Sequence, residues 1–484
     1  MLLIGILGEV GTGKTTLLQK LAYWWRSQGK ETEGFIAIAG ERAAGLGGAA
    51  RYDLQMLNGS GRFSYALRDE SLRPPYRFDE EASSALSRWA DRLATGVPPS
   101  LVIMDEFGPR EAAGGGHIAL WPRVLLAKPE IVVAAVRKGI QEKVEAQLGS
   151  RFEVLVDVGS ADAWESVRQA CVEHSDWMRV GLYGGGAGGF EASVGAVLHG
   201  GQIPLRGLFM SSMQSVILTY AANGMGQRRR VVWVAVIAAS LKALSPAGNR
   251  ARPMLAITIQ GLLYALAITL LGWNIVGVAL SGFLIGAWSA IQGVALQYLF
   301  VGNELLRTYD TIIQWIVRKL DVQAVGFLGI IAGWTLMCGV ASGALTLLAW
   351  KHRQQMPDRL RDVIFKKPVG VQVEWRPTTI AGTIKRGLRD IARPLFWLPV
   401  LIVTGVMLAS GSSLESVLWI VVRAAVVGFV LFSVVRSFDL RRFIAWLHNR
   451  GYRGPALAYR RAMDRMESSE VTSTDPKRSS SSDP

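Results

Sequence analysis

The stretch "GEVGTGKTT", residues 8–16, directly follows the apolar run "LLIGIL" (residues 2–7) and decides the fold of the N-terminal part. The pattern G-x-x-x-x-G-K-[ST] between a strand and a helix is typical of a loop that binds phosphate. Its glycines let the backbone curl until several N–H groups converge on phosphate oxygens, and the following helix adds the positive end of its dipole. We therefore expect a P-loop domain at the start of the chain.

The predicted phosphate site uses the whole loop. We expect the Lys14 ammonium to reach the β- and γ-phosphates and the Thr15 hydroxyl to ligate Mg²⁺. The expected ligands are Mg²⁺ and ATP or another nucleoside triphosphate. The residues predicted to contact the nucleotide are Gly8, Glu9, Val10, Gly11, Thr12, Gly13, Lys14, Thr15 and Thr16.

A second part of the predicted site lies in "LVIMDEFG" (residues 101–108), where a buried strand ends with Asp105 and Glu106. Ligands of open α/β sheets bind at the carboxyl edge of the strands, so we expect Asp105 beside the loop, holding the Mg²⁺ shell with Thr15. Glu106 is placed to act as general base on the attacking water. Arg51 and Arg137 could stabilise the transferred phosphoryl group, although most arginines are simply solvated.

Residues 1–180 alternate short apolar runs with helical patterns. This alternation predicts an α/β domain with a mainly parallel sheet covered by helices on both faces. "RYDLQML" (residues 51–57) is compatible with an added hairpin strand. The expected strands are residues 2–7, 34–39, 100–105, 130–136 and 152–158, and the expected helices are Lys14 to Gln28, Asp79 to Ala94 and Ile140 to Leu148.

The three stretches "GEVGTGKTTLL", "GFIAIAGERAAGLGGAARYDLQML" and "LVIMDEFGPRE" together resemble the bacterial and archaeal nucleoside-triphosphatase family once classified as nucleotide kinases. Asp105, Glu106, Gly108 and Glu111 match its DE-x-G-x-x-E motif position by position. The resemblance covers about residues 1–175 and implies slow, Mg²⁺-dependent hydrolysis of ATP, GTP or other nucleoside triphosphates. The sequence has no LSGGQ-like signature of an ABC ATPase and no H-R-D or D-F-G element of a protein kinase.

The composition changes after residue 180. The glycine-rich "GLYGGGAGGF" (residues 181–190) is expected to be a flexible linker. Residues 191–435 are predicted to form an all-α polytopic transmembrane bundle of about six helices, since residues 254–301 carry no charged side chain and need two spans. Residues 231–244 count as a short span, and the broken stretch 193–223 is either re-entrant or a further helix.

The charge is unevenly distributed. Residues 1–180 carry 21 Lys+Arg against 23 Asp+Glu, whereas the rest of the chain carries 32 against 15. Basic loops stay in the cytoplasm, so we expect a multi-pass protein of the cytoplasmic (inner) membrane, with residues 1–180, the basic loop 351–393 and the C-terminus on the cytoplasmic side of the bilayer. Residues 436–466 are predicted to be amphipathic basic helices on the inner leaflet, and residues 467–484 a disordered tail. No aromatic-basic interleaving or reading-helix motif indicates a nucleic-acid partner.

The segments "GAVLHGGQIPLRGLFMSSMQSVIL" and "LKALSPAGNRARPMLAITIQGLLY" resemble the substrate-binding membrane subunits of energy-coupling-factor vitamin transporters. This resemblance, over about residues 190–350, implies a small-molecule pocket and additional transporter subunits as partners. It suggests His199, Lys242, Asn249 and Gln260 as residues to test. The amide side chains within apolar stretches either line a cavity or join helices: Gln260, Asn274, Gln292, Gln297 and Asn303. Arg423, the sole charge near the middle of the last span, is expected to pair with another group or to face water.

Two functions remain open on the sequence. In the first, a membrane-bound, Mg²⁺-dependent nucleoside triphosphatase uses its nucleotide cycle to gate or power transport of a small solute. In the second, the N-terminal domain is a nucleotide sensor or a nucleotide kinase, and the helices only anchor it to the bilayer.

Overall fold

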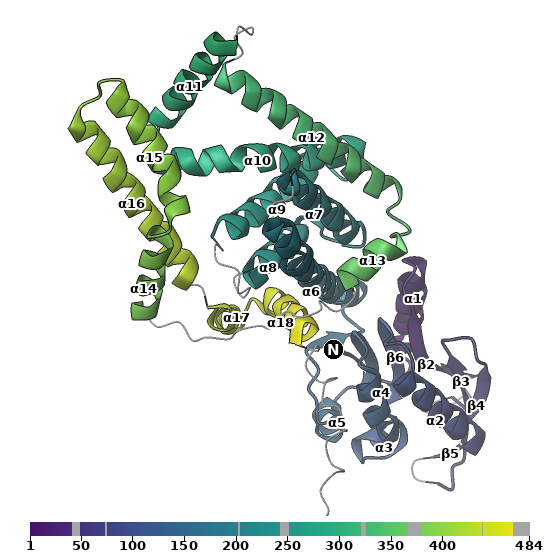
Figure 1. Ribbon diagram of the computed structural model, residues 1–484. Coiled ribbons are helices and arrows are strands. Elements are labelled where there is room, and N and C mark those ends of the chain that lie inside the picture. Colours follow the sequence, from purple (N-terminus) through teal and green to yellow (C-terminus); the bar gives the residue numbers. More distant parts are fainter. Residues whose placement is uncertain are drawn as a thin grey trace, which may run out of the picture. The chain divides into compact units, whose positions relative to one another are not determined.

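The computed structural model describes residues 1–40, 49–72, 75–201, 204–242, 251–320, 326–365, 380–437 and 439–467. The chain divides into two compact units, Met1–Ser175 and Asp176–Pro484. We call them the N-terminal unit and the helical unit and describe each by itself (Figure 1).

The N-terminal unit contains one eight-stranded mixed sheet with the order β5-β4-β3-β2-β6-β7-β1-β8. The five strands from β2 to β8 in this order are parallel, whereas β3, β4 and β5 extend the sheet with antiparallel pairings. The strands are β1 (Leu2–Gly8), β2 (Thr32–Ala39), β3 (Arg51–Met56), β4 (Arg62–Arg68), β5 (Tyr76–Phe78), β6 (Leu101–Phe107), β7 (Ile131–Arg137) and β8 (Val154–Asp157).

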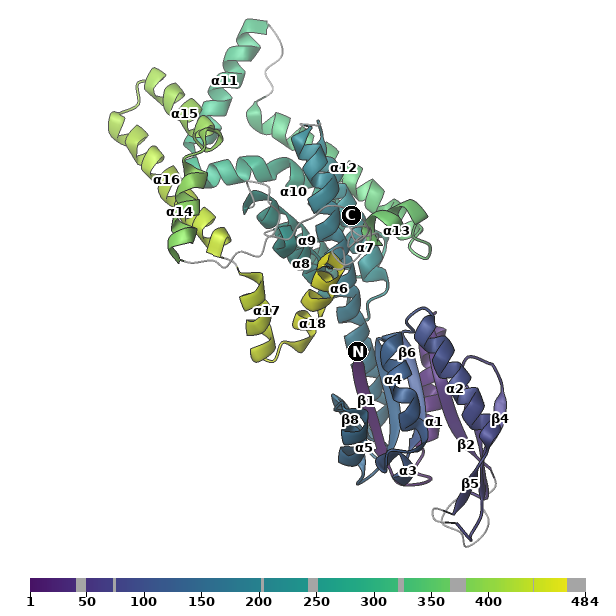
Figure 2. The same ribbon diagram turned by 60° about the horizontal axis from the view of Figure 1, so that its bottom comes forward.

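Helices cover both faces of this sheet, because successive side chains of the buried strands point to opposite sides. Val102 and Val132 join one core with the apolar faces of α2 and α4, while Leu101 and Ile131 join a second core with α1. Figure 2 shows helices on the two sides of the sheet. The helices of this unit are α1 (Lys14–Ser27), α2 (Glu80–Thr95), α3 (Pro109–Ala112), α4 (Trp121–Ala127) and α5 (Gln141–Leu148), with the 3-10 helix η1 (Gly116–Leu120).

The predicted α/β layering of this unit is therefore confirmed, including the hairpin strand at residues 51–57, which is β3. Strands β4 and β5 were not expected from the sequence. They make the sheet more mixed than predicted and add an antiparallel edge beyond β2.

The second unit is helical, and α6 (Ala163–Gly200) begins before the division and continues into it. Its other elements are α7 (Arg206–Asn223), η2 (Arg228–Val231), α8 (Val232–Lys242), α9 (Ala251–Leu271), α10 (Ile275–Val301), α11 (Glu304–Leu320), α12 (Phe327–Lys351), α13 (Asp358–Phe365), α14 (Ile380–Ile391), α15 (Pro394–Ala409), α16 (Leu414–Ser437), α17 (Leu440–Asn449) and α18 (Arg453–Glu467).

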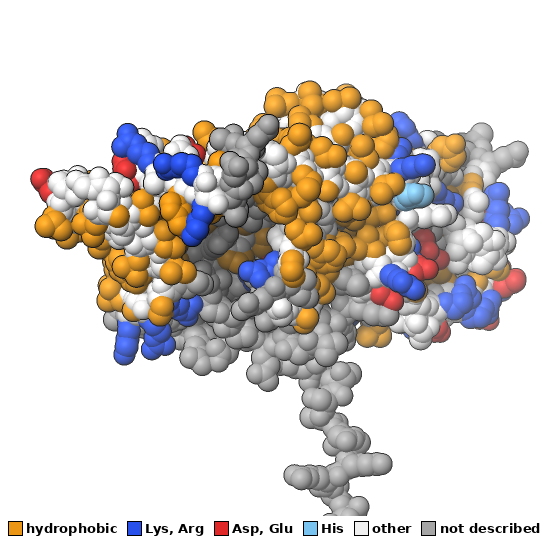
Figure 3. All heavy atoms as spheres, turned by 45° about the horizontal axis from the view of Figure 1, so that its top comes forward, with side chains coloured by type: hydrophobic (Ala, Val, Ile, Leu, Met, Phe, Trp, Pro, Cys, Tyr) orange, Lys and Arg blue, Asp and Glu red, His pale blue; other side chains and the backbone are white. Residues whose placement is uncertain are grey.

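Among the described residues, four helices are long and apolar enough to cross a membrane: Pro253–Leu271, Ile275–Val301, Phe327–Lys351 and Leu414–Val434. A fifth span results if α14 and α15, which are bent by 46° at a short break, count as one. The space-filling view in Figure 3 shows hydrophobic side chains gathered over the helical part of the molecule, and Leu262, Leu336 and Trp419 are among those exposed. This composition is compatible with a membrane protein.

The expectation of about six spans is therefore too high for the described residues. Helix α8 has 11 residues, which is about 16 Å at 1.5 Å per residue and too short for a hydrocarbon core of about 30 Å. The broken stretch 193–223, of which residues 202 and 203 lie outside the described residues, contains the end of α6 and helix α7, and neither is among the candidate spans.

The predicted linker at residues 181–190 is wrong, because this stretch lies inside α6. Its glycines allow other helices to approach closely: a Cβ added at Gly184 would lie 2.9 Å from Ile237 of α8, and one at Gly185 would lie 3.1 Å from Ala462 of α18. Tertiary packing thus outweighs the low helix propensity of glycine.

The C-terminal helices pack against the helical unit itself. Leu440 and Leu447 of α17 and Tyr459 of α18 are buried in its core, and the Tyr459 hydroxyl lies 2.9 Å from the Ser240 hydroxyl. Residues 436–466 thus form helices as expected, interrupted at Asp439 and at residues 450–452, and residue 438 lies outside the described residues. Much of the apolar surface of these helices is covered by protein. Of the predicted tail 467–484 only Glu467 is described, and residues 366–379 of the basic loop also lie outside the described residues.

Candidate functional site

The loop after β1 has the backbone that a phosphate cradle requires. Gly11 and Gly13 have φ angles of +77° and +98°, which L side chains rarely adopt. A Cβ at Gly8 would lie 2.5 Å from Thr12 Oγ1 and 2.6 Å from Val158 Cγ1. Helix α1 begins immediately after Gly13, so its first N–H groups face the loop.

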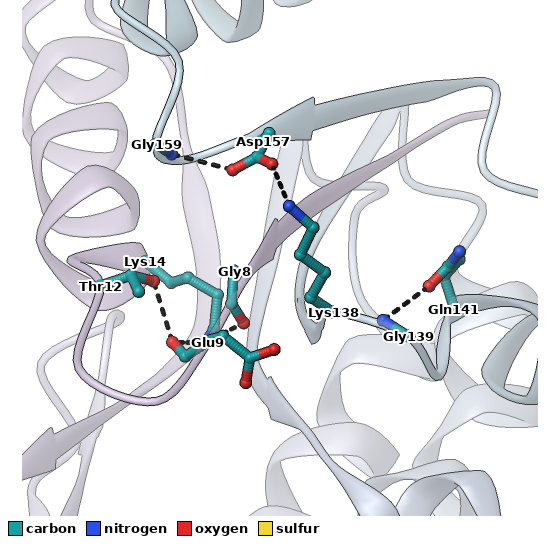
Figure 4. Close-up of polar contacts among 9 residues, drawn as sticks. All are labelled: Gly8, Glu9, Thr12, Lys14, Lys138, Gly139, Gln141, Asp157 and Gly159. Atoms are coloured by element: carbon teal, nitrogen blue, oxygen red, sulfur yellow. Dashed lines mark hydrogen bonds and ion pairs between the residues drawn. The ribbon is translucent and has the colours of Figure 1, made fainter.

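Lys14 lies inside this loop. Its side chain is buried, and the ammonium donates hydrogen bonds to the carbonyl oxygens of Gly8 at 2.9 Å and Glu9 at 2.8 Å. Figure 4 shows the side chain running toward these two carbonyls. The ammonium is therefore held where it would face the oxygens of a phosphate bound by the loop.

The structure brings Thr15 and Asp105 together. The Thr15 hydroxyl donates a 2.8 Å hydrogen bond to Asp105 Oδ2, and the Ala37 amide donates to the same oxygen at 3.1 Å. Thr15 is in the first turn of α1, and Asp105 is near the end of β6. The glycine-rich loop and the acidic pair thus meet at the carboxyl edge of the sheet, which is where open α/β sheets bind their ligands.

Asp105 is completely buried, and its Oδ1 has no hydrogen-bond partner among the described residues. Burial raises the pKa of this carboxyl to about 7, and the Glu106 charge adds to the rise. A buried carboxylate oxygen without a partner is costly unless a cation or proton satisfies it. With the adjacent Thr15 hydroxyl, this donor set fits Mg²⁺, which prefers oxygen ligands.

Glu106 has an unusual backbone. Its φ angle is +75°, and the register between β6 and β7 shifts between Met104 and Phe107. A non-glycine residue in this region costs free energy, and such outliers cluster at functional sites. Burial raises the pKa of the Glu106 carboxyl, while the charges of Lys14 and Arg137 oppose the rise. The raised pKa suits a group that accepts a proton at neutral pH.

Glu111 shapes the segment after β6. Its carboxylate accepts hydrogen bonds from the Gly108 amide at 2.9 Å and the His117 amide at 3.3 Å. The His117 ring is buried, with Nε2 lying 3.1 Å from the Tyr65 hydroxyl, and burial lowers the pKa of His117 to about 3. Glu111 and His117 therefore organise the loop that follows Glu106.

The two arginines singled out in the sequence differ in position. Arg51 is exposed and forms a 2.6 Å ion pair with Asp53. This ion pair directs the guanidinium toward Asp53 and not toward the loop. Arg137 ends β7, with its Nε 3.6 Å from Glu9 Oε2. Of the remaining predicted contacts, Glu9, Val10, Gly11, Thr12 and Thr16 are exposed around the loop.

The rim of the loop contains residues that the sequence did not single out. Lys138 forms a 2.9 Å ion pair with Asp157 at the end of β8, and Asp157 also accepts a 3.0 Å hydrogen bond from the Gly159 amide (Figure 4). These contacts hold the segments after β7 and β8 beside the glycine-rich loop.

A cavity of about 290 Å³ adjoins the loop and is lined in part by Lys14, Glu106 and Arg137. Its other walls come from β3, β4, β5 and the segment after β6, which sequence reasoning did not connect with the site. The alternation in "RFSYALR" and "YRF" could have indicated strands carrying aromatic side chains on one face.

Fewer of the residues predicted in the helical unit lie together in one site than in the N-terminal unit. Lys242 is buried, with its ammonium 3.6 Å from Glu191 Oε1 and donating to the Glu191 carbonyl at 3.1 Å. Asn274 caps α10 by accepting bonds from two amides, and Arg423 donates to the Leu299 carbonyl at 3.5 Å. Gln260 is buried, whereas Asn249 and the side chain of His199 lie outside the described residues.

No known family, no curated protein and no solved structure matches this chain. Both resemblances seen in the sequence therefore stay predictions.

Proposed function

We propose that the N-terminal unit is a Mg²⁺-dependent nucleoside triphosphatase. The observation that carries this proposal is the contact between Thr15 and Asp105, joined by a 2.8 Å hydrogen bond beside a buried Lys14. A hydroxyl from a glycine-rich loop, a carboxylate from a neighbouring strand and a lysine are the parts that recur in phosphoryl-transfer sites.

In the proposed reaction, water attacks the γ-phosphorus, its proton passes to the Glu106 carboxylate, and the bond from the γ-phosphorus to the bridging oxygen breaks. The products are a nucleoside diphosphate and inorganic phosphate. Lys14 and the N–H groups of the loop stabilise the charge that develops on the phosphate oxygens. Thr15 and Asp105 would hold Mg²⁺, which supplies additional charge neutralisation when bound.

Phosphate release by the purified full chain tests the hydrolase proposal. With Mg²⁺ and ATP, GTP, CTP or UTP, we expect turnover with at least one nucleotide and a loss of at least 100-fold in Lys14→Ala. Lys143→Ala, which removes an exposed lysine of α5, is the matched control and should retain activity. Turnover that survives in Lys14→Ala would assign the activity to another site.

We also propose that the nucleotide cycle serves the helical unit by gating or powering movement of a small solute, with further subunits as possible partners. The four candidate spans and the buried Lys242–Glu191 pair support a bundle with an interior function. The alternative is a membrane-anchored sensor or kinase without transport. Liposomes containing the full chain distinguish these two proposals. If the nucleotide cycle drives or gates transport, a transport substrate changes nucleotide turnover and crosses the bilayer. If the chain is an anchored sensor or kinase, neither effect occurs.

A further inference from the structure

The cavity beside the phosphate loop contains an aromatic wall. Four rings line it: Tyr52, Tyr65, Tyr76 and Phe78. They are fixed by edge-to-face contacts, with ring centroids 5.5 Å apart for Tyr52 and Tyr76 and 5.3 Å apart for Tyr65 and Phe78. Rigid rings from the antiparallel part of the sheet are suited to stacking against a planar heterocycle.

The cavity is also basic. Four basic side chains line it (Lys14, Arg68, Arg110 and Arg137) against two carboxylates, Glu106 and Glu111. The Arg110 guanidinium lies 4.0 Å from the centroid of the Phe78 ring. The Arg68 guanidinium lies 5.9 Å from the centroid of the Tyr76 ring, and its Nε forms a 2.5 Å ion pair with Glu70. Guanidinium groups held on ring faces can present their N–H donors to phosphate oxygens. The preferred occupant is therefore an aromatic ring that carries an anionic phosphate.

The position of the cavity relative to the loop indicates what its occupant would do in the reaction. Lys14 and Glu106 belong both to this cavity and to the loop site. Lysine and the metal-binding hydroxyl of such a loop contact the β- and γ-phosphates, so the cavity meets the γ end of a bound triphosphate. Its aromatic wall comes from β3 to β5, which are separated from β1 by β7, β6 and β2 in the sheet order. An occupant of the cavity would therefore approach the γ end of the triphosphate.

We propose that this cavity binds a nucleoside monophosphate as acceptor of the γ-phosphoryl group. The inference rests on the proposed nucleotide site and adds a second substrate to it. A phosphate oxygen of the monophosphate attacks the γ-phosphorus while the bond to the bridging oxygen breaks, and the electron pair of that bond stays with the departing diphosphate. Both products are nucleoside diphosphates. The attacking oxygen is already anionic, so no proton has to be removed, in contrast to the attack of water.

The full chain is tested with Mg²⁺ and its best triphosphate in mixtures with AMP, GMP, CMP, UMP or dTMP. Ion-exchange chromatography measures the diphosphate derived from each monophosphate, and phosphate release is measured in the same samples. We expect a new diphosphate with at least one monophosphate. Tyr76→Ala and Arg110→Ala should each lower its formation at least tenfold at a subsaturating monophosphate concentration.

Arg77→Ala is the matched control, because Arg77 lies between Tyr76 and Phe78 on β5 but its side chain is exposed. It should transfer phosphate at the wild-type rate. If the wild-type chain releases phosphate but forms no diphosphate from any monophosphate, the acceptor site is wrong and the hydrolase proposal stands. If neither product appears, both proposals are wrong. A monophosphate that binds without being phosphorylated also overturns the inference.

Discussion

The Thr15 hydroxyl and Asp105 Oδ2 are 2.8 Å apart although 90 positions separate them in the sequence. Helix α1 and strand β6 are the two elements that bring them together at one edge of the sheet. The contact places a hydroxyl and a buried carboxylate on one side of the loop that holds Lys14. It is the geometric basis of the phosphoryl chemistry proposed above, and each part of it can be varied separately.

Asp105→Asn should separate stability from activity. Asparagine keeps an oxygen that can accept from Thr15 and Ala37 but loses the charge. Because burial raises the pKa of Asp105 to about 7 from an ordinary value of 3.8, the nucleotide-free protein loses stability as the pH rises from about 4 to about 7. At pH 8 the variant should gain on the order of 2–4 kcal/mol in unfolding free energy.

The same substitution should lower Mg²⁺-dependent turnover at least 100-fold, since the metal loses a charged ligand. Thermal unfolding of the full chain with and without Mg²⁺ and nucleotide, together with phosphate release, measures both effects. A variant that is less stable than the wild type at pH 8 would show that the Asp105 charge is compensated within the fold.

Glu106→Gln should affect chemistry rather than binding. Glutamine is nearly isosteric but cannot take a proton from water, so turnover should fall by about 10²–10⁴-fold. The loop residues and Asp105 remain, so the dissociation constant for a fluorescent nucleotide with Mg²⁺ should change less than about threefold. Turnover within about tenfold of the wild type would mean that another group activates the water.

His117 should make the N-terminal unit sensitive to acid. Burial lowers its pKa to about 3 from an ordinary 6.5, so below pH 6.5 the unfolded chain binds a proton that the folded chain does not. Stability is then lost as the pH falls, by about 2 kcal/mol between pH 7 and pH 5.

Hydrogen exchange of the β6 and β7 amides in the full chain reports this loss. The variant His117→Gln retains a hydrogen-bonding group for Tyr65. The difference in unfolding free energy between this variant and the wild type should shrink by about 2 kcal/mol as the pH falls from 7 to 5. A difference that does not change with pH would indicate that His117 has the same pKa in the folded unit as in the unfolded chain.

Gly181→Ala should disturb the packing of α18 on α6. A Cβ at Gly181 would overlap the Ala458 carbonyl oxygen and lie 2.9 Å from Arg461 Cβ, which requires α18 to move. Such overpacking typically costs about 1–3 kcal/mol. Gly207→Ala on α7 is the control, because its Cβ would meet nothing within 4 Å, and alanine is the better helix former. Thermal unfolding and protease cleavage within α18 distinguish the two variants.

Much of the N-terminal unit could be predicted because its signals are local. The apolar runs ending at Gly8 and Asp105 are strands, and the glycine spacing before Lys14 requires the observed backbone. The contact between Thr15 and Asp105 follows from the rule that parallel strands present their carboxyl ends on one edge. The aromatic wall could not be predicted in the same way, because it depends on the pairing of β4 with β3 and with the short edge strand β5, which only the sheet order reveals.

The helical unit was harder to predict for a physical reason. Apolar composition does not tell a span from a buried helix, so the 11 residues of α8 were counted as a span. The amphipathic α11 lies between two candidate spans, α10 and α12. The glycines of residues 181–190 indicate flexibility only when nothing packs on them, and the partners in α8 and α18 are distant in the sequence.

Helix α6 also determines where the chain can be divided for biochemical work. Cys171 belongs to the hydrophobic core of the N-terminal unit, whereas Trp177 and Val180 belong to that of the helical unit. A protein truncated at residue 180 would expose these two apolar side chains to solvent, which favours aggregation. A truncation before Cys171 would instead expose part of the sheet to solvent. A cut just after Ser175 avoids both faults, so the most suitable fragment of the N-terminal unit ends in the middle of a helix.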